Sequence, residues 1–444
     1  MTASLPASPV GEGGAPPSAP GARAVHGQQA KPEEAFVTVD VPTAPPLREL
    51  LTRPSVAEVF VHAAAQIHRA TADLWPDAPV CLEQHVPSVT SYVHRARVGD
   101  RTLYAKVSIL GVSLVSLLRG ACGNWSNVLQ AQREYEARAD GLLEREAAQL
   151  RLLAAMERPR VCALAGVERG VMFTEPVTGP SLGDLLLVHP GDTAELLALS
   201  LAELRPLHRT DAARRLGSAG AIGERSIAGT FLRKFNGLSG AVYVDRLGAE
   251  RCDTEQRQEV VELLRRTVAR LHRLRMALPP VPRTMLAYGD LKPEHVVFPD
   301  GPEGRPVLLD PGLLRAGPAV DVAKLLSRTV LFLAARQPGA ATARQVVEGL
   351  GEFEEARALR LPRRARRVWL RELLTLWLMD TTNILTTYLS APAALPLPGY
   401  GLALVERAGA VCALVEAVSA DLATSADARS VWERALTHAV AVTP

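Results

Sequence analysis

Hydrophobic and polar positions follow two different periods along the chain. From Val56 to Trp75, apolar side chains recur at helical spacing and predict a leading helix. Short runs of alternating character follow, and one strongly helical run, Leu142 to Met156, lies among them. These runs predict a small antiparallel sheet with strands at Val80-Cys81-Leu82, Tyr92 to Val98, Leu103 to Ile109, Val161 to Leu164 and Val171 to Thr174.

After Pro176 the helical period dominates, and a single hairpin interrupts it. The hairpin is predicted from Val296-Val297-Phe298, a turn containing Pro and Gly, and Val307-Leu308-Leu309. Helices are predicted at Asp192 to His208, Ser226 to Leu238, Thr254 to Leu278, Ala340 to Phe353, Arg366 to Leu389 and Leu402 to Leu422. A small sheet lobe followed by a mainly helical lobe with one hairpin predicts an α+β fold.

Two stretches lack a clear period. Residues 1–45 are dense in Pro, Gly, Ala and Ser and cannot bury enough apolar surface to offset chain entropy, so we expect a disordered tail. The domains we predict are this tail, an N-lobe over residues 46–176 and a C-lobe over residues 177–444. Leu110 to Asp140 is of mixed character. Within it, the apolar residues of Ser108 to Trp125 either pack on the sheet, which we favour, or form an exposed docking surface.

Composition and charge limit the class of protein. The 444 residues carry a formal net charge of +3, which is too small to indicate a nucleic-acid or membrane partner. The five cysteines are scattered without a C-x-x-C pair, as is typical of reduced thiols in a cytosolic protein. The chain shows no secretory signal and no apolar window of the roughly 18 residues that span a membrane. We therefore expect a soluble, cytoplasmic protein.

Lysine is rare in this sequence. Only five of the 50 basic residues are lysines, and the other 45 (50 − 5) are arginines. Where a lysine remains, we infer that a compact ammonium is required instead of a planar guanidinium. The five are Lys31, Lys106, Lys234, Lys292 and Lys324.

Candidate catalytic and metal-binding residues lie on both sides of the predicted hairpin. Before it stands Tyr288-Gly289-Asp290-Leu291-Lys292-Pro293-Glu294-His295, and after it Asp310-Pro311-Gly312. Both ends of a hairpin meet on the same side, so we expect Asp290 and Asp310 to converge. Phosphoryl transfer needs one carboxylate beside the attacking hydroxyl and a second that holds magnesium between the phosphates. The stretch therefore indicates phosphoryl transfer.

The strings GDLKPEHVVF and VLLDPG resemble the catalytic and metal-binding segments of aminoglycoside phosphotransferases, choline kinases and other kinase-like small-molecule phosphotransferases. The resemblance implies a protein-kinase-like two-lobed fold and an ATP-dependent kinase with an alcohol group as acceptor. By the same resemblance Asp290 matches the catalytic base and Asp310 the principal metal ligand. Lys292 either reaches the γ-phosphate or faces solvent.

The resemblance extends to nucleotide-binding and structural residues. Lys106 matches the lysine that contacts the α- and β-phosphates, and Glu146, with Glu144 as the alternative, matches its ion-pair partner. The pair Leu207-His208 and the later Asp321 resemble structural residues of such proteins.

Two backbone segments also match. Thr174-Glu175-Pro176-Val177 matches the hinge whose backbone holds adenine, which implicates Glu175 and Val177. The turn Pro87-Ser88-Val89-Thr90-Ser91 occupies the place of the phosphate-covering turn, which implicates Ser88, Thr90 and Ser91.

Three departures from the family pattern bear on activity. His295 stands where the family has a metal-binding asparagine, and its softer nitrogen makes Mn²⁺ an alternative to Mg²⁺. The phosphate turn has no glycine, so its amides approach phosphate less closely. Pro311 removes an amide donor beside Asp310.

Two functions remain open at this point. The favoured one is transfer of the γ-phosphate of ATP to a hydroxyl of a small molecule (an aminoglycoside-like antibiotic, a sugar or an amino alcohol) or of a peptide Ser or Thr. The alternative is a catalytically weak or inactive kinase-like module that binds a nucleotide or a peptide.

Two further motifs have simple structural explanations. Gly179-Pro180-Ser181-Leu182-Gly183 fits the G-x-S-x-G elbow of α/β-hydrolases, but that fold needs repeated βα units, which the sequence lacks. Ser181 and Asp184 instead predict a capping box that opens a helix. The run Arg360 to Arg367 either binds an acidic partner or phosphorylated substrate or forms a solvated helix face, and we favour the solvated face.

Overall fold

The sheet predicted in the first part of the chain is present, with five antiparallel strands in the order β1-β2-β3-β5-β4. This computed structural model describes residues 53–425 and 427–443, so the tail predicted over residues 1–45 lies outside the described residues. The strands are β1 Val80–Val86, β2 Tyr92–Val98, β3 Arg101–Val107, β4 Leu164–Glu168 and β5 Val171–Thr174. β4 begins where the predicted strand was to end, because Val161 instead forms an isolated bridge with Leu308.

Helices cover both faces of the sheet, and the strand period decides which side chains meet which helix. The helices of this lobe are α1 Val56–Leu74, α2 Leu114–Leu118, α3 Trp125–Glu136 and α4 Leu142–Ala154. Ala105, Val107 and Phe173 pack against α1, whereas Met172 packs against α4. Because side chains alternate along a strand, Lys106, between Ala105 and Val107, lies on the α4 side of the sheet.

The stretch of mixed character forms two helices that were not predicted. Each begins at a side-chain cap: Ser113 accepts a hydrogen bond from the amide of Ser116, and Asn124 accepts one from the amide of Asn127. α3 buries only Val128 and Gln132 completely, although its apolar residues Trp125, Val128, Leu129 and Tyr135 recur at helical spacing.

α2 is buried in the large core cluster that runs through the helical lobe and also includes Val59 of α1 and Val128 of α3. Its residues Leu114, Val115, Leu117 and Leu118 belong to this cluster and not to the cluster between α1 and the sheet. Arg119 at its end stacks over the ring of Tyr243, 4.7 Å from the ring centre. The expectation that this stretch packs in the core is confirmed for the residues of α2, although they lie outside the cluster between α1 and the sheet, and their burial excludes an exposed docking surface there.

Replacing Leu117 with alanine tests how firmly α2 is tied to the helical lobe. Leu117 is 0% exposed, so we expect a loss of about 2–5 kcal/mol in the free energy of unfolding, from lost transfer energy and the cavity left behind. Urea unfolding monitored by circular dichroism measures it. Leu238→Ala is the control, because Leu238 is 88% exposed and its truncation should change stability by less than about 0.5 kcal/mol.

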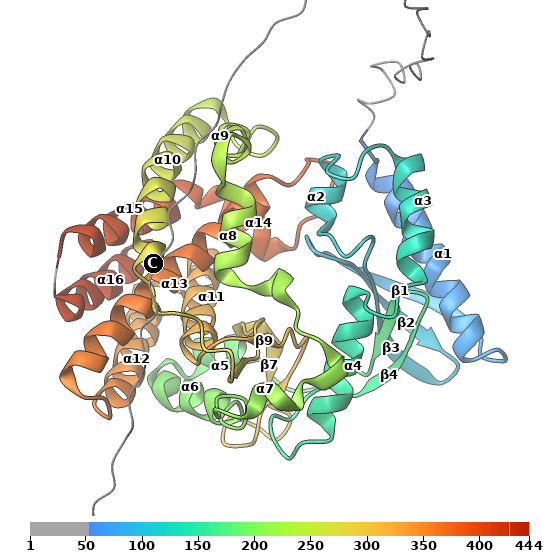
Figure 1. Cartoon of the computed structure of the whole chain (residues 1–444), viewed down its shortest axis with the longest axis horizontal. Coiled ribbons are helices and arrows are strands. Elements are labelled where there is room, and N and C mark those ends of the chain that lie inside the picture. The colour runs from blue at the N-terminus through green and yellow to red at the C-terminus, as the bar shows by residue number, and fades with distance from the viewer. Residues whose placement is uncertain (1–52, 426, 444) are drawn as a thin grey trace, which may run out of the picture. The chain divides into compact units, whose positions relative to one another are not determined.

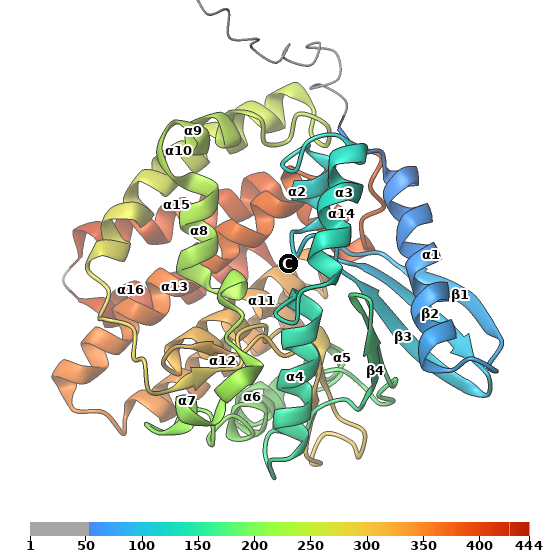
Figure 2. The same cartoon turned by 45° about the vertical axis from the view of Figure 1, so that its right-hand side comes forward.

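The helical lobe is built around two long helices. Its helices are α5 Leu182–Val188, α6 Thr193–Ala202, α7 Ala212–Arg215, α8 Ile227–Phe235, α9 Gly237–Asp245, α10 Thr254–Met276, α11 Ala319–Arg336, α12 Ala340–Ala358, α13 Arg363–Leu389, α14 Gly399–Glu406, α15 Ala408–Thr424 and α16 Ala428–Val442. α11 and α13 pack on each other at the centre, and α10, α12, α15 and α16 surround them (Figures 1 and 2). A small sheet followed by this lobe confirms the predicted α+β fold class.

Two differences from the predicted helices have physical causes. α11 was not predicted; it buries its polar residues Asp321 and Lys324 along with its apolar ones, so it does not divide into a buried apolar face and an exposed polar face. The helix predicted over Leu402 to Leu422 is two helices, which break at Arg407, where ψ is 10° instead of a helical value. None of the helices in the described part of the chain has both the length and the apolar character needed to cross a membrane.

The predicted hairpin and capping box are both confirmed. β7 Val296–Val297 pairs with β8 Val307–Leu308, and a second short pair, β6 Leu286–Ala287 with β9 Leu314–Arg315, encloses it. Ser181 accepts a hydrogen bond from the amide of Asp184, whose carboxylate accepts from the amide and the hydroxyl of Ser181. The hydroxyl of Ser181 thus caps the N-terminus of α5. At the start of α13, Arg363, Arg364 and Arg367 are exposed, as expected of a solvated face.

Candidate active site

The hairpin and its enclosing strands place Asp290 and Asp310 in one region. The amide of Gly312 donates to the carbonyl of Tyr288 (2.9 Å), and the amide of Leu309 donates to the carbonyl of His295 (2.9 Å). These bonds fasten the segment after β8 to the segment after β6. Gly289 has φ +86°, and a Cβ there would lie 2.1 Å from the carbonyl oxygen of Gly312, so only glycine allows this approach.

Lys106 reaches this region from the sheet. Its Nζ lies 2.6 Å from Glu146 Oε1 on α4 and 3.5 Å from Asp310 Oδ1. Burial alone would lower the pKa of the Lys106 ammonium, but the charges of Asp310 and Glu146 outweigh burial and raise the pKa. Of the two glutamates considered on α4, Glu146 is the one that pairs with Lys106, and its side chain is 0% exposed.

Asp290 is held by two cations that its motif does not contain. Arg225 Nη1 lies 3.2 Å from Asp290 Oδ2, and Lys324 Nζ lies 4.0 Å from Oδ1. Burial would raise the pKa of the Asp290 carboxyl, but these two cations hold that pKa well below its usual range. Asp290 is therefore an anion at every pH of interest, with a side chain still 26% exposed.

His295 lies beside Asp310. Its Nε2 is 3.7 Å from Asp310 Oδ2. Burial, reinforced by the charge of Lys292, lowers the pKa of His295 to about 3, so the ring is neutral at pH 7. Burial opposes ionisation of Asp310, but the charge of Lys106 outweighs burial and keeps the pKa of its carboxyl low. A neutral imidazole and a carboxylate thus stand side by side.

The segment that carries Asp290 is anchored from behind by Asp321. Its carboxylate is 0% exposed and accepts hydrogen bonds from the amides of Tyr288 (2.9 Å) and Gly289 (3.0 Å). His208 Nε2 lies 3.0 Å from the same carboxylate. The structural placement expected for His208 and Asp321 is confirmed.

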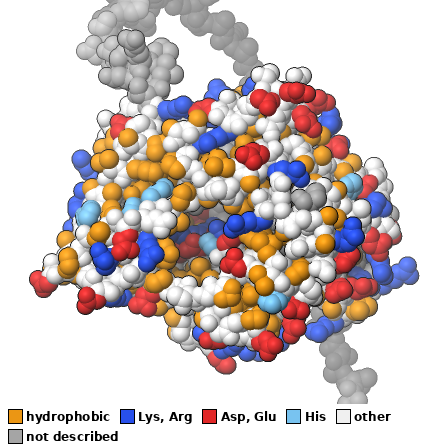
Figure 3. Space-filling view, turned by 180° about the vertical axis from the view of Figure 1, so that it is seen from behind, with side chains coloured by type: hydrophobic (Ala, Val, Ile, Leu, Met, Phe, Trp, Pro, Cys, Tyr) orange, Lys and Arg blue, Asp and Glu red, His pale blue; other side chains and the backbone are white. Residues whose placement is uncertain are grey.

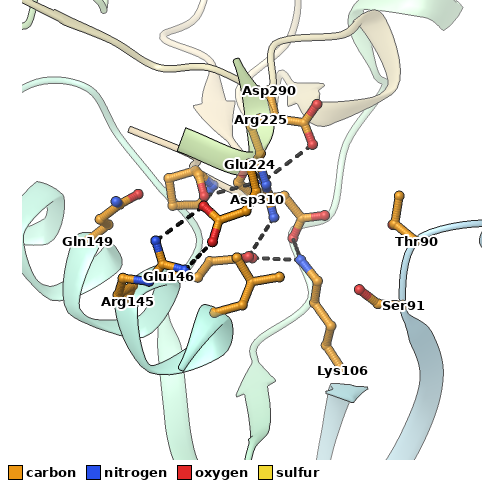
Figure 4. A network of polar contacts seen from close by, with 12 residues as sticks. Thr90, Ser91, Lys106, Arg145, Glu146, Gln149, Glu224, Arg225, Asp290 and Asp310 are labelled. Atoms are coloured by element: carbon orange, nitrogen blue, oxygen red, sulfur yellow. Dashed lines mark hydrogen bonds and ion pairs between the residues drawn. The ribbon is translucent and has the colours of Figure 1, made fainter. Parts of the chain in front are cut away.

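The turn between β1 and β2 approaches Lys106 from the other side. Thr90 and Ser91 lie on the side of Lys106 that faces away from α4 (Figure 4). Within the turn, the hydroxyl of Ser88 accepts hydrogen bonds from the amides of Thr90 (3.3 Å) and Ser91 (3.5 Å). The first amides of α2, from Leu114 and Val115, donate to the carbonyls of Thr90 and Val89. A turn without glycine is therefore shaped by its own serine and held by α2.

The predicted hinge residues and Lys292 are less engaged with the site. The amide of Glu175 already donates to the carbonyl of Ala163 (2.9 Å), and its side chain pairs with Arg101 at 3.0 Å. Val177 is half-buried and packs on the cluster that contains α4. Lys292 is half-buried, close enough for its charge to act on Asp290, His295 and Asp310.

Two residues of the site were missed by sequence reasoning. Lys324, on α11, donates hydrogen bonds to the carbonyls of Gly289 and Arg225, in addition to facing Asp290. Its rarity as a lysine was a signal that could have found it. Arg225 offered no such signal, since it is one of 45 arginines and stands in no recognised motif.

The donor set fits a divalent cation that is shared with phosphates. Within residues 53–425 and 427–443, no three His, Cys, Asp or Glu side chains are grouped so that they could hold a metal ion by themselves. The 3.7 Å between Asp310 Oδ2 and His295 Nε2 nevertheless allows both atoms to contact one ion at about 2.0–2.2 Å. Mg²⁺ is usually held by one or two protein groups plus substrate phosphates and water. Side chains of both charge signs and of histidine line the hollow near the middle of the face drawn in Figure 3.

Comparison with known proteins adds a family and several solved structures that resemble this chain. Residues 126–361, just over half of the 444 residues, match the family model described as "Phosphotransferase enzyme family". The matched range contains Glu146, Asp290 and Asp310 and begins after Lys106. None of the curated proteins is significantly similar in sequence.

The solved structures that resemble this chain share little sequence with it. A microcompartment-associated aminopropanol kinase is 15% identical with a TM-score of 0.45, covering 83% of this chain and 100% of that one. The ethanolamine kinase of Plasmodium vivax is 11% identical with a TM-score of 0.39, covering 78% and 86%. The choline kinase LicA of Streptococcus pneumoniae is 15% identical with a TM-score of 0.37, covering 79% and 99%.

Proposed function

The chain belongs to the phosphotransferase enzyme family, and on this premise we propose that it transfers the γ-phosphoryl group of ATP to a hydroxyl group of an organic acceptor. The observation that carries the proposal is the chain of ion pairs from Glu146 through Lys106 to Asp310, with Asp290 in the same network. Catalysis of phosphoryl transfer consists mainly of positioning and of neutralising charge, and this network supplies both.

The nucleotide side of the proposed site is formed by the sheet and α4. Lys106, fixed by Glu146, offers its ammonium to the α- and β-phosphates, and its raised pKa keeps it protonated. Ser88, Thr90 and Ser91 cover the phosphates from the turn between β1 and β2. At the hinge the amide of Glu175 is already used, so we assign the donor to adenine to the amide of Val177.

The acceptor side is formed by Asp290. The acceptor oxygen forms a bond to the γ-phosphorus while the bond between that phosphorus and the β–γ bridging oxygen breaks, leaving ADP and the phosphorylated acceptor. Because its pKa is held so low, Asp290 acts chiefly by accepting a hydrogen bond that orients the hydroxyl, and the proton leaves late, to Asp290 or to solvent. Lys292, half-buried beside it, is placed to neutralise the γ-phosphate.

Asp310 and His295 are the residues that would hold a divalent cation. The cation, Mg²⁺ or Mn²⁺, would neutralise charge on the phosphate oxygens. Because His295 is neutral at pH 7, one of its ring nitrogens carries a lone pair, and Nε2 is the nitrogen that lies 3.7 Å from Asp310.

Transfer of labelled phosphate from ATP tests the proposed function directly. The full chain is incubated with Mg²⁺ and four acceptor classes: amino alcohols, sugars, an aminoglycoside, and a peptide with Ser and Thr. We expect a labelled product with one of these classes and none with Asp310→Ala. Nucleotide binding is followed in parallel by thermal shift with ATP and Mg²⁺.

A binding module without catalysis is the second candidate function. It is favoured by His295 in place of a metal-binding asparagine and by Pro311, which has no amide to donate beside Asp310. Stabilisation by ATP without transfer to any acceptor or to water would select this candidate. Absence of both stabilisation and transfer would contradict the two together.

Replacing His295 with asparagine is expected to shift the metal preference. An amide oxygen is a harder ligand than an imidazole nitrogen, so the ratio of the transfer rate with Mn²⁺ to that with Mg²⁺ should fall by about tenfold. The rates are measured at saturating ATP with each metal in turn. His68→Asn, an exposed histidine of α1, is the control and should leave the ratio unchanged. An unchanged ratio in His295→Asn would remove His295 from the metal site.

A further inference from the structure

A short segment, residues 220–225, crosses from α4 to the hairpin and is bonded to both; we call it the clamp segment. On the α4 side, Arg145 donates to the carbonyl of Ala221 (2.7 Å) and pairs with Glu224 at 2.5 Å. Gln149, one turn further along α4, donates to the carbonyl of Gly220 (2.7 Å). Figure 4 shows Arg145, Glu146 and Gln149 on α4, with Glu224 and Arg225 beside them.

On the hairpin side the clamp segment joins the strand that follows Asp310. The amide of Ile222 donates to the carbonyl of Leu313 (2.8 Å), and the amide of Leu313 donates to Gln149 (2.7 Å). The carbonyl of Arg225 accepts from Lys324 (3.0 Å). Both ends of the clamp segment are therefore tied, one to α4 and one to the hairpin and α11.

Arg225 stands at the end of the clamp segment and joins the two halves of the site. Its Nη2 lies 2.6 Å from Glu146 Oε2, and its Nη1 lies 3.2 Å from Asp290 Oδ2 and 2.9 Å from the carbonyl of Asp310. The guanidinium passes so close to Gly312 that a Cβ there would lie 2.3 Å from Arg225 Cδ. The side chain is only 15% exposed.

We propose that Arg225 is a positioning residue for phosphoryl transfer, which sets Glu146 on the nucleotide side and Asp290 on the acceptor side at the same time, with the clamp segment holding it in place. This role rests on the proposed function. A single planar guanidinium can donate along two directions at once, and here one edge serves Glu146 and the other Asp290. A lysine ammonium on its flexible stem can satisfy one of these carboxylates but not both in fixed geometry.

The consequence is that α4 cannot swing away from the hairpin without breaking a buried ion pair. Glu146 is 0% exposed, and each of its two oxygens has one cation, Lys106 on Oε1 and Arg225 on Oε2. When Arg225 is removed, Lys106 still neutralises Glu146, so nucleotide binding should persist. Asp290 keeps Lys324 but loses its closest cation and its link to α4. The defect should therefore fall on kcat and not on KM for ATP.

The test compares Arg225→Met and Arg225→Lys with the unaltered chain and with Arg214→Met, whose arginine is 84% exposed on α7. Hydrolysis of ATP without acceptor, and transfer to any acceptor already found, give kcat and KM. Hydrogen–deuterium exchange of residues 142–154, measured without nucleotide, reports the anchoring of α4 independently of activity. We expect kcat to fall about 100-fold in Arg225→Met and about tenfold in Arg225→Lys, with KM for ATP changed by less than about threefold.

Each outcome decides the matter. Faster exchange of α4 together with the loss in kcat supports the positioning role, and Arg214→Met should resemble the unaltered chain. Should Arg225→Met fail to fold, Arg225→Lys decides alone: a lower kcat at an unchanged melting temperature supports the role, and an unchanged kcat overturns it. If no variant, the unaltered chain included, turns over ATP, the proposed function fails, and the exchange data still show whether Arg225 anchors α4. Unchanged exchange and unchanged kcat in Arg225→Met overturn the role of Arg225 and leave the proposed function standing.

Discussion

Asp290→Asn should reduce kcat for phosphoryl transfer by about 10²- to 10⁴-fold while leaving the fold and ATP binding intact. Asparagine keeps the shape of the side chain but loses the negative charge that accepts the hydrogen bond of the acceptor hydroxyl. The substitution is tolerated structurally because the two cations around Asp290 have other partners. Arg225 also pairs with Glu146, and Lys324 also donates to backbone carbonyls. Single-turnover transfer of labelled phosphate gives the rate, and thermal shift with ATP checks binding.

The control for this substitution lies in the same hairpin. Glu303→Gln removes a carboxylate from the exposed turn between β7 and β8 and should leave kcat unchanged. The pH profile gives an independent check. The pKa of Asp290 is depressed, so the activity that needs its ionised form is present above that low pKa and is lost only below it. We therefore expect no loss of kcat from Asp290 between pH 8 and pH 5. Transfer that survives Asp290→Asn at the original rate would remove Asp290 from its assigned role.

The elements that could be predicted from sequence are those with a clear period or a side-chain signature. The hairpin could be predicted because two short apolar runs flank a turn with Pro and Gly, and the capping box of Ser181 and Asp184 because its spacing is fixed. α11 and α3 were not predicted. α11 buries its polar residues Asp321 and Lys324 together with its apolar ones, so it differs from an ordinary surface helix. α3 carries Trp125, Val128, Leu129 and Tyr135 at helical spacing and could have been found from its sequence.

Some residues of the site could be identified from sequence motifs, and others could be identified only from the three-dimensional structure. Asp290 and Asp310 could be placed together in advance because they bracket a hairpin, whereas Lys106 was placed with them only by the family resemblance. The partner of Asp290 could not, because Arg225 comes from an irregular segment whose position depends on bonds to α4 and to the hairpin. The scarcity of lysine could also have pointed to Lys324 and Lys234, two rare lysines with specific contacts. Lys324 faces Asp290, and the half-buried Lys234 of α8 donates hydrogen bonds from its ammonium to Asn383 and Thr387 of α13.

Asp321→Ala is expected to be the most destabilising single change near the site, with a loss of about 3–5 kcal/mol in the free energy of unfolding. The carboxylate is 0% exposed and accepts from two backbone amides and from His208, so its removal leaves three buried polar groups without their partner. Since one of those amides belongs to Gly289, directly before Asp290, the transfer rate should also fall in the folded fraction. Urea unfolding and the transfer assay at 15 °C measure the two effects separately.

His208→Ala is the graded comparison for this prediction. It removes one of the three groups that Asp321 holds and leaves both backbone bonds intact, so we expect a loss of only about 1–2 kcal/mol and a transfer rate close to that of the unaltered chain. Asp321→Ala should be the more damaging change because the two backbone hydrogen bonds of Asp321 hold the loop that carries Asp290. His208 only supports the carboxylate of Asp321. If His208→Ala proved as damaging as Asp321→Ala in both stability and rate, the anchoring of Asp290 would have to depend on the imidazole and not on the two amides.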